Sequence, residues 1–283
     1  MLGVVDDEVR FAPDLYRGTA AYYDRFRPRY PGAMTDDLIG RVSPSGHGRL
    51  LDLACGTGQL AFPLRGWFTE VWAVDSEPDM IEQVEAKAAS AGAAETIRPV
   101  LAAAEDLRAG PGHFELVVIG NAFHRLRRDI IADRVLGWLE PGGYLALCWS
   151  ASPWLAGETD GSRAADWQRV LAGTLEAWMA ARGATGRIPA DWNRGRKERP
   201  DLQVLSAAGF EAAGRYEFTS AHRWTVPELA GFVRSTSFLP PSVLGDQAAA
   251  FDASLASALD PYADGGYLTA TISFSYELAR KPS

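Results

Sequence analysis

Cysteine and histidine are scarce in this sequence of 283 residues. It contains only two cysteines, Cys55 and Cys148, and four histidines that lie far apart. Neither a C-x-x-C nor an H-x-x-x-H spacing occurs, so the pattern of a metal site is missing and we expect no bound metal. Both cysteines end apolar segments, which favours free buried thiols in a reducing compartment over a disulfide framework.

Long apolar runs and clusters of positive charge are also missing. No run reaches the roughly 18 apolar residues that a membrane helix needs, and no basic-then-apolar signal begins the chain. Lysine occurs only three times, and the net charge is −8. Binding to nucleic acid depends on clustered Lys and Arg side chains. We therefore expect a soluble cytoplasmic protein that binds neither membranes nor nucleic acid; its oligomeric state stays open.

Apolar segments that alternate with amphipathic ones are abundant from residue 49 onward. Pro78 and Gly92 stand at the two ends of one such amphipathic segment, as is usual for a helix. Pro99 interrupts an apolar segment, which places that strand near an edge. This alternation predicts a parallel sheet covered on both faces. The strands are expected at 49–54, 70–75, 96–102, 114–120 and 144–150, with helices at 59–68, 77–92 and 128–140.

The regular alternation of apolar and amphipathic segments ends after residue 150. The segment 163–183 is expected to be a helix, 202–210 a helix that ends at Gly209, and 211–224 a strand. The last apolar segment, 266–279, alternates with period two and predicts a long strand. We divide the chain into an N-terminal segment that closes over a cofactor, a core in three pieces, and two helical excursions that form a lid for the acceptor. The boundaries are 1–47 for the first, 48–151 with 200–222 and 263–283 for the core, and 152–199 with 223–262 for the lid.

An acid followed by a glycine-rich turn ends the first expected strand. The segment LLDLACGTGQ, residues 50–59, places Asp52 just before Gly56 and Gly58. Ligands of an open parallel sheet bind beyond the carboxyl ends of its strands, and glycines let a ligand approach the backbone closely. With Ala61, the glycines match a dinucleotide fingerprint loosely. A carboxylate at Asp52 suits a cation better than a pyrophosphate.

A second acid, Asp75, ends the second expected strand, EVWAVD. It is placed to accept hydrogen bonds from both hydroxyls of a ribose, and such bonds to a charged group contribute roughly 1.5–3 kcal/mol each. NAD and S-adenosylmethionine sites both have this feature, so Asp75 predicts a ligand with a nucleoside but does not distinguish between these two cofactors. The alternative is that Asp75 only caps the following helix.

Five segments together resemble the ordered motifs of class I S-adenosylmethionine-dependent methyltransferases. They are LLDLACGTG, VWAVDSEPDMI, AAAEDL, FELVVIGNAFHRL and LEPGGYLALCW, and their order matches across roughly residues 16–150. Upstream, YYDRFRPRYP resembles the lead-in of the small-molecule branch, and NAFHRL resembles its QAFHW variant. The resemblance implies an α/β, Rossmann-like sheet of seven strands in the order 3-2-1-4-5-7-6, with strand 7 antiparallel and a helical lid.

The resemblance also implies roles for residues at matching positions. Asp52 would lie near the ammonium group of S-adenosylmethionine, Asp75 would hold the ribose, and Met80 would form an apolar wall for the adenine. Many relatives have Asp where this chain has Ala103, so Glu105 is the nearest substitute. The implied cofactor-binding set is Tyr22, Arg27, Asp52, Ala54, Cys55, Gly56, Gly58, Gln59, Asp75, Ser76, Met80, Ala104, Glu105 and Asn121.

The expected activity is methyl transfer from S-adenosylmethionine to an oxygen or nitrogen of a small biosynthetic acceptor. His124 follows an expected strand end, and its ordinary pKa suits a general base; the alternative is a structural histidine. Two other functions stay open: a catalytically silent S-adenosylmethionine-binding partner, and an NAD-dependent oxidoreductase. The expected acceptor-binding residues are Arg125, Trp149, Trp154, Trp192 and Trp224.

Overall fold

A computed structural model describes residues 11, 14–155, 166–189 and 194–283. Its centre is a seven-stranded sheet in the order β3-β2-β1-β4-β5-β7-β6. The first five strands are parallel, and β7 pairs antiparallel with both β5 and β6. The predicted sheet, with strand 3 and its Pro99 at an edge, is therefore confirmed. The strands are β1 (Arg49–Leu53), β2 (Glu70–Asp75), β3 (Ile97–Leu101), β4 (Phe114–Gly120), β5 (Leu139–Ser150), β6 (Glu211–Trp224) and β7 (Leu268–Arg280).

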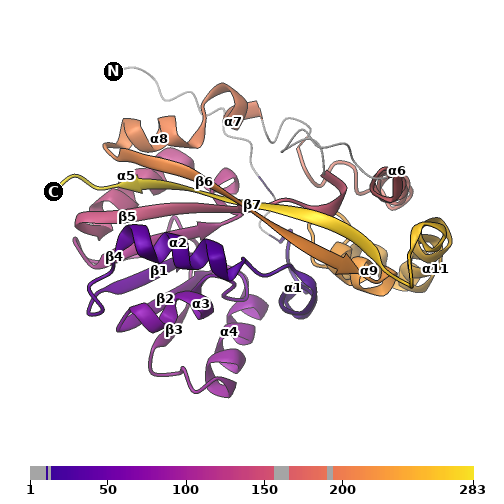
Figure 1. Ribbon diagram of the computed structural model, residues 1–283, viewed down its shortest axis with the longest axis horizontal. Coiled ribbons are helices and arrows are strands. Elements are labelled where there is room, and N and C mark those ends of the chain that lie inside the picture. The colour runs from indigo at the N-terminus through magenta and orange to yellow at the C-terminus, as the bar shows by residue number, and fades with distance from the viewer. Residues whose placement is uncertain (1–10, 12–13, 156–165, 190–193) are drawn as a thin grey trace.

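Helices cover both faces of the sheet because each buried strand is apolar on both sides. Neighbouring residues of β1, Leu50 and Leu51, belong to two different hydrophobic clusters, as the alternation of side chains along a strand requires. One face is covered by α2 (Gly32–Val42), α3 (Ala61–Leu64) and α4 (Pro78–Ser90); the other is covered by α5 (Arg128–Trp138) and α8 (Asp201–Ala208) (Figure 1).

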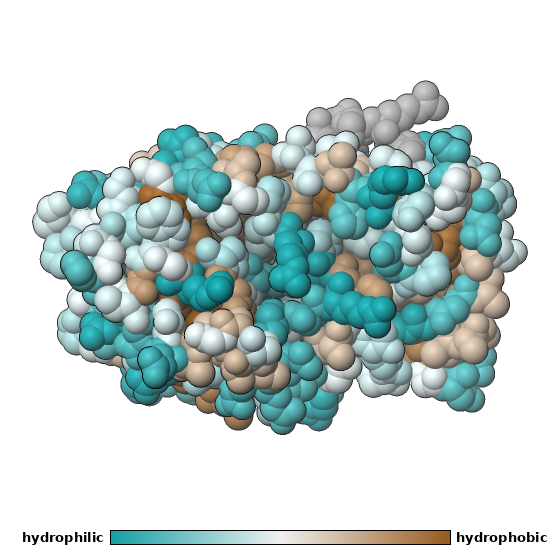
Figure 2. Space-filling view, turned by 60° about the horizontal axis from the view of Figure 1, so that its bottom comes forward, coloured by the Kyte–Doolittle hydropathy of each residue, from teal (hydrophilic) through white to brown (hydrophobic). Residues whose placement is uncertain are grey.

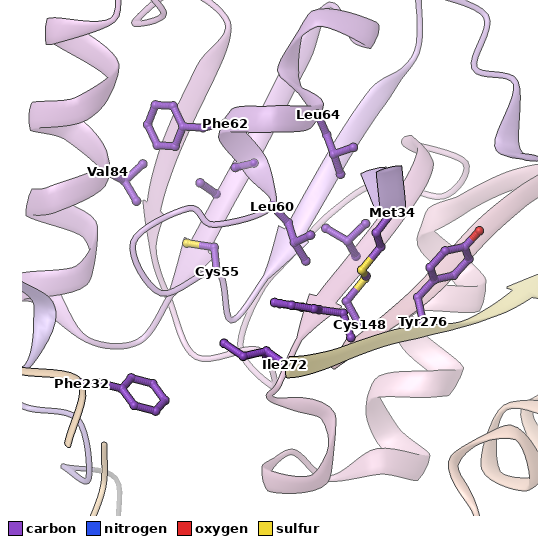
Figure 3. Close-up of a cluster of buried hydrophobic side chains, with 14 of the residues drawn as sticks. Met34, Cys55, Leu60, Phe62, Leu64, Val84, Cys148, Phe232, Ile272 and Tyr276 are labelled. Atoms are coloured by element: carbon purple, nitrogen blue, oxygen red, sulfur yellow. The ribbon is translucent and has the colours of Figure 1, made fainter. Parts of the chain in front are cut away.

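The first cluster extends from the sheet into the loop after β1. Phe62 of α3 and Val84 of α4 lie close to each other, while Cys55 projects from the loop beside Leu60 (Figure 3). Both cysteines are free and buried. The loop that carries the glycine turn therefore rests on a packed apolar layer rather than standing free.

A second group of helices gathers beyond one end of the sheet (Figure 1). It consists of α6 (Asp166–Ala181), α9 (Val226–Arg234) and α11 (Ala248–Leu259), and the short helix α1 (Ala20–Phe26) packs against α9. The indole of Trp178 donates a hydrogen bond to Ser254 at 3.0 Å and so joins α6 to α11. The remaining short helices are α7 (Arg194–Glu198) and α10 (Pro241–Leu244).

The helix predicted at 59–68 is much shorter than expected. Only α3 is α-helical there, and a single 3-10 turn, Arg65–Trp67, follows it. Glycine is unfavourable inside a helix, and Gly66 lies in that turn. Because residues 56–60 form a turn and Arg65–Trp67 a 3-10 turn, only the four residues between them are α-helical.

The surface shows no large apolar area on the face drawn in Figure 2, where hydrophilic side chains prevail. The most exposed large hydrophobic residues, such as Trp67 and Leu101, are scattered among the described residues. No helix in the described ranges is both long and apolar enough to cross a membrane.

Candidate active site

A pocket that is open to solvent lies at the carboxyl ends of β1, β4 and β5. Its walls come from the N-terminal segment, the loop after β1, and the ends of β4 and β5. They are formed by Tyr23, Arg27, Pro28, Tyr30, Asp52, Ala54, Cys55, Gln59, Leu60, Gly120, Asn121 and Ser150.

The backbone around the pocket adopts left-handed conformations at four positions. Ala54 and Asn121 have φ values of 57° and 52°, which are uncommon for residues other than glycine. Gly56 and Gly58 have φ values of 54° and 78°. Strain of this kind concentrates at ligand sites, where the surrounding structure enforces it.

Asn121 is fixed in its position by β5. Its amide nitrogen donates to the hydroxyl of Ser150 at 2.7 Å, and its amide oxygen accepts from the Ser150 backbone N–H at 3.0 Å. These two bonds explain how a residue with positive φ can be held at the end of β4.

Asp52 is buried directly beneath the glycine turn, with 1% of its surface exposed. One carboxyl oxygen accepts the backbone N–H of Ala61 at 2.8 Å. Burial raises the pKa of Asp52 to about 7, because the charged form loses its hydration. A cationic ligand in the pocket would restore the favourable charge balance.

Asp75 supports the glycine turn from the tip of β2. One of its oxygens accepts the N–H of Gly56 at 2.8 Å, and the other accepts the N–H of Glu77 at 3.0 Å, where α4 begins. Burial raises its pKa, while these N–H groups act in the opposite direction. Each carboxylate oxygen has two lone pairs, so both can still accept a ligand hydroxyl. The predicted capping role and a ligand-binding role are therefore compatible.

Two buried side chains near the turn have polar atoms without a partner among the described residues. Both amide atoms of Gln59 and the hydroxyl of Thr57 make no hydrogen bond. Buried polar groups in proteins are nearly always satisfied, so such atoms indicate a missing partner. Because Gln59 lines the pocket, a polar ligand there would satisfy its amide.

The residues predicted for the adenine lie beside Asp75 but do not line the pocket. Met80 and Ala104 are buried, and Ser76 is exposed. Glu105 accepts the backbone N–H of Arg127 at 3.1 Å. Their contact with an adenine stays a prediction.

Tyr23, which the sequence analysis did not select, takes the place expected for Tyr22. Gly56 faces the ring of Tyr23, and a Cβ on that glycine would lie 3.4 Å from it. Tyr22 instead stacks on Phe26, away from the pocket. Adjacent residues of a helix point in directions about 100° apart, so only one of the two can face the turn. Periodicity could not choose between them without knowing where α1 packs.

Arg27 lines the pocket as predicted and connects it to α9. Its guanidinium lies 4.7 Å from the ring centroid of Tyr23 and 4.9 Å from that of Phe232. Its Nε donates to the hydroxyl of Ser235 at 2.9 Å. The N-terminal segment therefore touches both the pocket and the helices beyond it.

His124 lies in a 3-10 turn after β4 and does not line the pocket. Arg125 donates from Nε to His124 Nε2 at 3.2 Å, and the indole ring of Trp149 lies 5.4 Å away. Burial lowers the pKa of His124 well below its ordinary value, and the guanidiniums of Arg125, Arg196 and Arg128 lower it further. The imidazole is therefore neutral and weakly basic.

Of the tryptophans predicted for the acceptor, Trp154 and Trp224 both pack against the ring of Phe232, whereas Trp149 packs against the second hydrophobic cluster. Trp149 lies beneath the guanidinium of Arg196 at 3.9 Å, and Trp154 packs on Phe232 at 5.3 Å. Trp224 is fully buried in the core rather than at a pocket wall. Trp192 lies outside the described residues.

Comparison with known proteins agrees with this geometry. A family model described as a methyltransferase domain matches residues 50–143. An uncharacterized methyltransferase of Mycobacterium tuberculosis is 31% identical over 128 residues, which are 45% of this chain and 49% of that protein. A Saccharomyces cerevisiae protein assigned as an S-adenosylmethionine-dependent methyltransferase is 25% identical over 135 residues, 47% of this chain and 46% of that protein.

Residues 50–143 therefore form a methyltransferase domain by this match. The chain spans about half the length of the curated relatives it matches. The relationship lies in the sheet and its glycine turn, because the matched residues 50–143 run from β1 into β5.

Solved structures resemble the methyltransferase domain in fold. A protein of Anaeromyxobacter dehalogenans assigned as a type II methyltransferase has a TM-score of 0.59 at 19% identity, covering 91% of this chain and 98% of that one. The [4+2]-cyclase SpnF has a TM-score of 0.52 at 20% identity, covering 88% and 80%. At such identities the likeness concerns the fold alone.

The pocket of the methyltransferase domain fits S-adenosylmethionine by its chemistry. Asp52 offers a buried carboxylate to a cation, and Gln59 has an unsatisfied amide. Asp75 does not line the pocket but holds the glycine turn beside it, where its oxygens can accept ribose hydroxyls. In the described ranges, no cluster of three or more His, Cys, Asp or Glu side chains is arranged to hold a metal ion.

Proposed function

We propose that this protein transfers the methyl group of S-adenosylmethionine to an oxygen or nitrogen of a small biosynthetic acceptor. The observation that carries the proposal is the pair of buried carboxylates, Asp52 and Asp75, which stand on either side of a left-handed glycine turn at the tips of adjacent strands. Asp52 would attract the cationic end of the cofactor, and Asp75 would accept hydrogen bonds from its ribose.

The side chains around the pocket would bind and orient the two reactants. S-adenosylmethionine, when bound, supplies a methyl group on a sulfonium that is already activated for displacement. Asp52 and Gln59 would hold its charged and polar end, while Tyr23 and Arg27 would close the pocket against water. Alignment of two reactants can by itself contribute roughly 7–11 kcal/mol to catalysis.

The three parts of the chain would have different roles in binding the cofactor and the acceptor. The segment 1–47 would close over the cofactor, the sheet would hold it, and the excursions 152–199 and 223–262 would select the acceptor. Arg27 lines the pocket of the core and donates to Ser235 of the excursion 223–262. These contacts support such a division, because one residue of the N-terminal segment touches both the core and the excursion.

A catalytically silent cofactor-binding protein is the second candidate function. The neighbour SpnF bears the name of a [4+2]-cyclase, so a protein of this fold need not be named for methyl transfer. Binding of S-adenosylhomocysteine without methyl transfer to any acceptor class would favour this candidate. The oxidoreductase alternative predicts instead that NADH raises the melting temperature and S-adenosylhomocysteine does not.

Asp75 provides the direct test of the cofactor site. We expect Asp75→Asn to weaken S-adenosylhomocysteine binding by about tenfold or more, because charge-assisted bonds to the ribose become ordinary ones. Isothermal titration calorimetry measures the effect. Asp129→Asn, at an exposed position on α5, is the matched control and should leave the affinity unchanged. Unchanged affinity in Asp75→Asn would contradict the ribose assignment.

Methyl transfer itself is tested with isotope-labelled S-adenosylmethionine and a panel of small alcohols, phenols, acids and amines. Labelled product in any of these classes supports the proposal. Binding of S-adenosylhomocysteine with no product across the panel would contradict it and would leave the silent candidate.

A further inference from the structure

Arg27 lines the pocket and Arg125 lies over Tyr16, and neither has an acidic partner in the part of the chain that the structure describes. Arg27 makes its polar contacts with the hydroxyl and the carbonyl of Ser235, at 2.9 and 3.1 Å. Arg125 donates to His124 and lies over the ring of Tyr16 at 4.5 Å. Among the described residues, no carboxylate forms an ion pair with either guanidinium.

Some half-buried arginines of this chain pair with acids, whereas others, such as Arg65, donate to a backbone carbonyl. Arg128 and Arg196 share Asp201, at 2.9 and 2.8 Å, and Arg234 pairs with Asp252. Arginine that is removed from water is stabilised by an anion, and an unpaired buried cation is unfavourable. An anion close to Arg27 and Arg125 would therefore be stabilised by both guanidiniums.

Tyr16 lies in the positive electrostatic potential of these two arginines. The side chains of Ser237 and Arg125 lie close enough to its hydroxyl to lower its pKa. Burial alone would raise the pKa of Tyr16, but the guanidiniums of Arg125 and Arg27 outweigh burial and lower it. Since a phenol there loses its proton more easily, any anion is stabilised at the same point.

This point adjoins the cofactor pocket and the acceptor excursion. The rings of Tyr16 and Tyr23 meet edge to face at 6.3 Å, and Tyr23 lines the pocket. Ser237 follows α9, and its carbonyl accepts a bond from Arg187 at 3.1 Å. Arg187 adds a third cation for which no ion pair with a described acid occurs.

We propose that the acceptor is a small organic carboxylate, and that Arg125 binds its acidic group together with the hydroxyls of Tyr16 and Ser237. This inference rests on the proposed function and names the acceptor class of the same site. A guanidinium has five N–H donors, and Arg125 uses Nε for His124, so its terminal nitrogens remain able to bind a carboxylate in a fork. Arg27 and Arg187 would add positive potential.

The test compares acids with their neutral amides on the full chain saturated with S-adenosylhomocysteine. The probes are benzoate with benzamide, phenylacetate with phenylacetamide, and octanoate with octanamide, and calorimetry measures each affinity. We expect at least one acid to bind about tenfold or more tightly than its amide, because only the acid forms charge-assisted bonds. Arg125→Gln should reduce that preference to within about threefold, and Arg125→Lys should restore part of it.

Arg98→Gln is the control, since Arg98 lies on the edge strand β3 with its side chain 56% exposed. It should keep the full preference for acids. Binding of S-adenosylhomocysteine to each variant shows that the variant is folded. Tyr16→Phe, which removes one hydroxyl and no charge, is the second variant and should weaken acid binding less than Arg125→Gln.

Two results would overturn the inference: no preference for the acid in any pair, or an undiminished preference in Arg125→Gln. Either can occur while S-adenosylhomocysteine binds normally and neutral acceptors are methylated. In that case the proposed function stands and only the acceptor class is wrong. Failure to bind S-adenosylhomocysteine at all would instead contradict the proposed function.

Discussion

The buried carboxyl of Asp52 couples ligand binding to pH. Its pKa of about 7 means that the free protein holds a proton there in mildly acidic solution. The ionised form is the one that attracts a cation, so binding of a cationic ligand requires that the proton leave. We expect affinity for S-adenosylmethionine to fall by up to about tenfold for each pH unit below about 7.

Calorimetry between pH 5.5 and 8 in buffers of different ionisation enthalpy, at about constant ionic strength, measures both affinity and proton release. Asp52→Asn should bind more weakly at pH 8 and lose the pH dependence. An affinity in the parent protein that does not vary with pH would contradict the assignment.

The same carboxyl acts in the opposite direction on the stability of the ligand-free protein. Its folded-state pKa lies above the unfolded value of about 3.9, so folding favours the protonated form. That stabilising contribution is complete below about pH 4 and is lost as the pH rises through about 7.

His124 is expected to contribute little as a base. A pKa lowered well below the ordinary value leaves the imidazole neutral but a poor proton acceptor. A general base contributes roughly 10²–10⁴-fold. We therefore expect His124→Asn to reduce turnover by less than about 10²-fold, with the affinity for S-adenosylhomocysteine unchanged. Single-turnover kinetics measures the chemical step, and a larger loss with intact affinity would return His124 to the role of base.

At the scale of elements, one buried acid joins three helices. Asp201, at the start of α8, has 1% of its side chain exposed and accepts from Arg128 of α5 and Arg196 of α7. Removing one partner of a buried ion pair leaves uncompensated charge and costs about 3–5 kcal/mol. We expect Asp201→Ala to lower the free energy of unfolding by about that amount, measured by denaturant titration.

The matched control is Asp129→Ala, because its ion pair with Arg199 is exposed at the surface. Its cost should stay below about 1 kcal/mol. If the two variants lose the same stability, the Asp201 pairs are no more important than a surface pair.

The elements differ in how far the sequence could predict them. The strands were predictable because their apolar runs are separated by clear turn residues, and the long period-two segment predicted the strand that is now β7. Its antiparallel place between β5 and β6 followed only from the family resemblance. The length of α3 was not, because the glycine turn before it and the 3-10 turn after it limit it at both ends. The hydrogen bond between Arg27 and Ser235 joins residues 208 positions apart, so no local sequence pattern predicts it.

The residues of the candidate site also differ in how far the sequence could predict them. Asp52, the glycine turn and Asp75 were predictable because the chemistry lies in one short motif and one strand end. The choice of Tyr23 over Tyr22 depends on how α1 packs, and the cluster of Tyr16, Arg125 and Ser237 combines segments from three parts of the chain. Such combinations depend on tertiary structure rather than on a local pattern.

At the scale of the whole molecule, the N-terminal segment links the sheet to the helices beyond it. Asp79 of α4 accepts the N–H groups of Gly18 and Ala20 at 3.0 and 3.3 Å. Lys87, also of α4, donates to Asp24 at 2.6 Å. Within α1 only Ala20 is buried, so the helix has little core of its own and depends on these polar contacts.

A segment that buries little apolar surface, here Ala20 with the partly buried Phe26, opens at a lower cost in free energy than the core. A ligand that packs beneath Tyr23 stabilises the closed form and shifts this equilibrium. We therefore expect trypsin to cleave the ligand-free protein early at Arg17, Arg25 or Arg29, and saturating S-adenosylhomocysteine to slow that cleavage by about tenfold or more. Mass spectrometry of timed digests identifies the sites. Asp79→Ala should speed cleavage of the ligand-free protein, whereas Asp133→Ala, an exposed change on α5, should not. Equal cleavage with and without S-adenosylhomocysteine would show that the segment does not act as a gate for the cofactor.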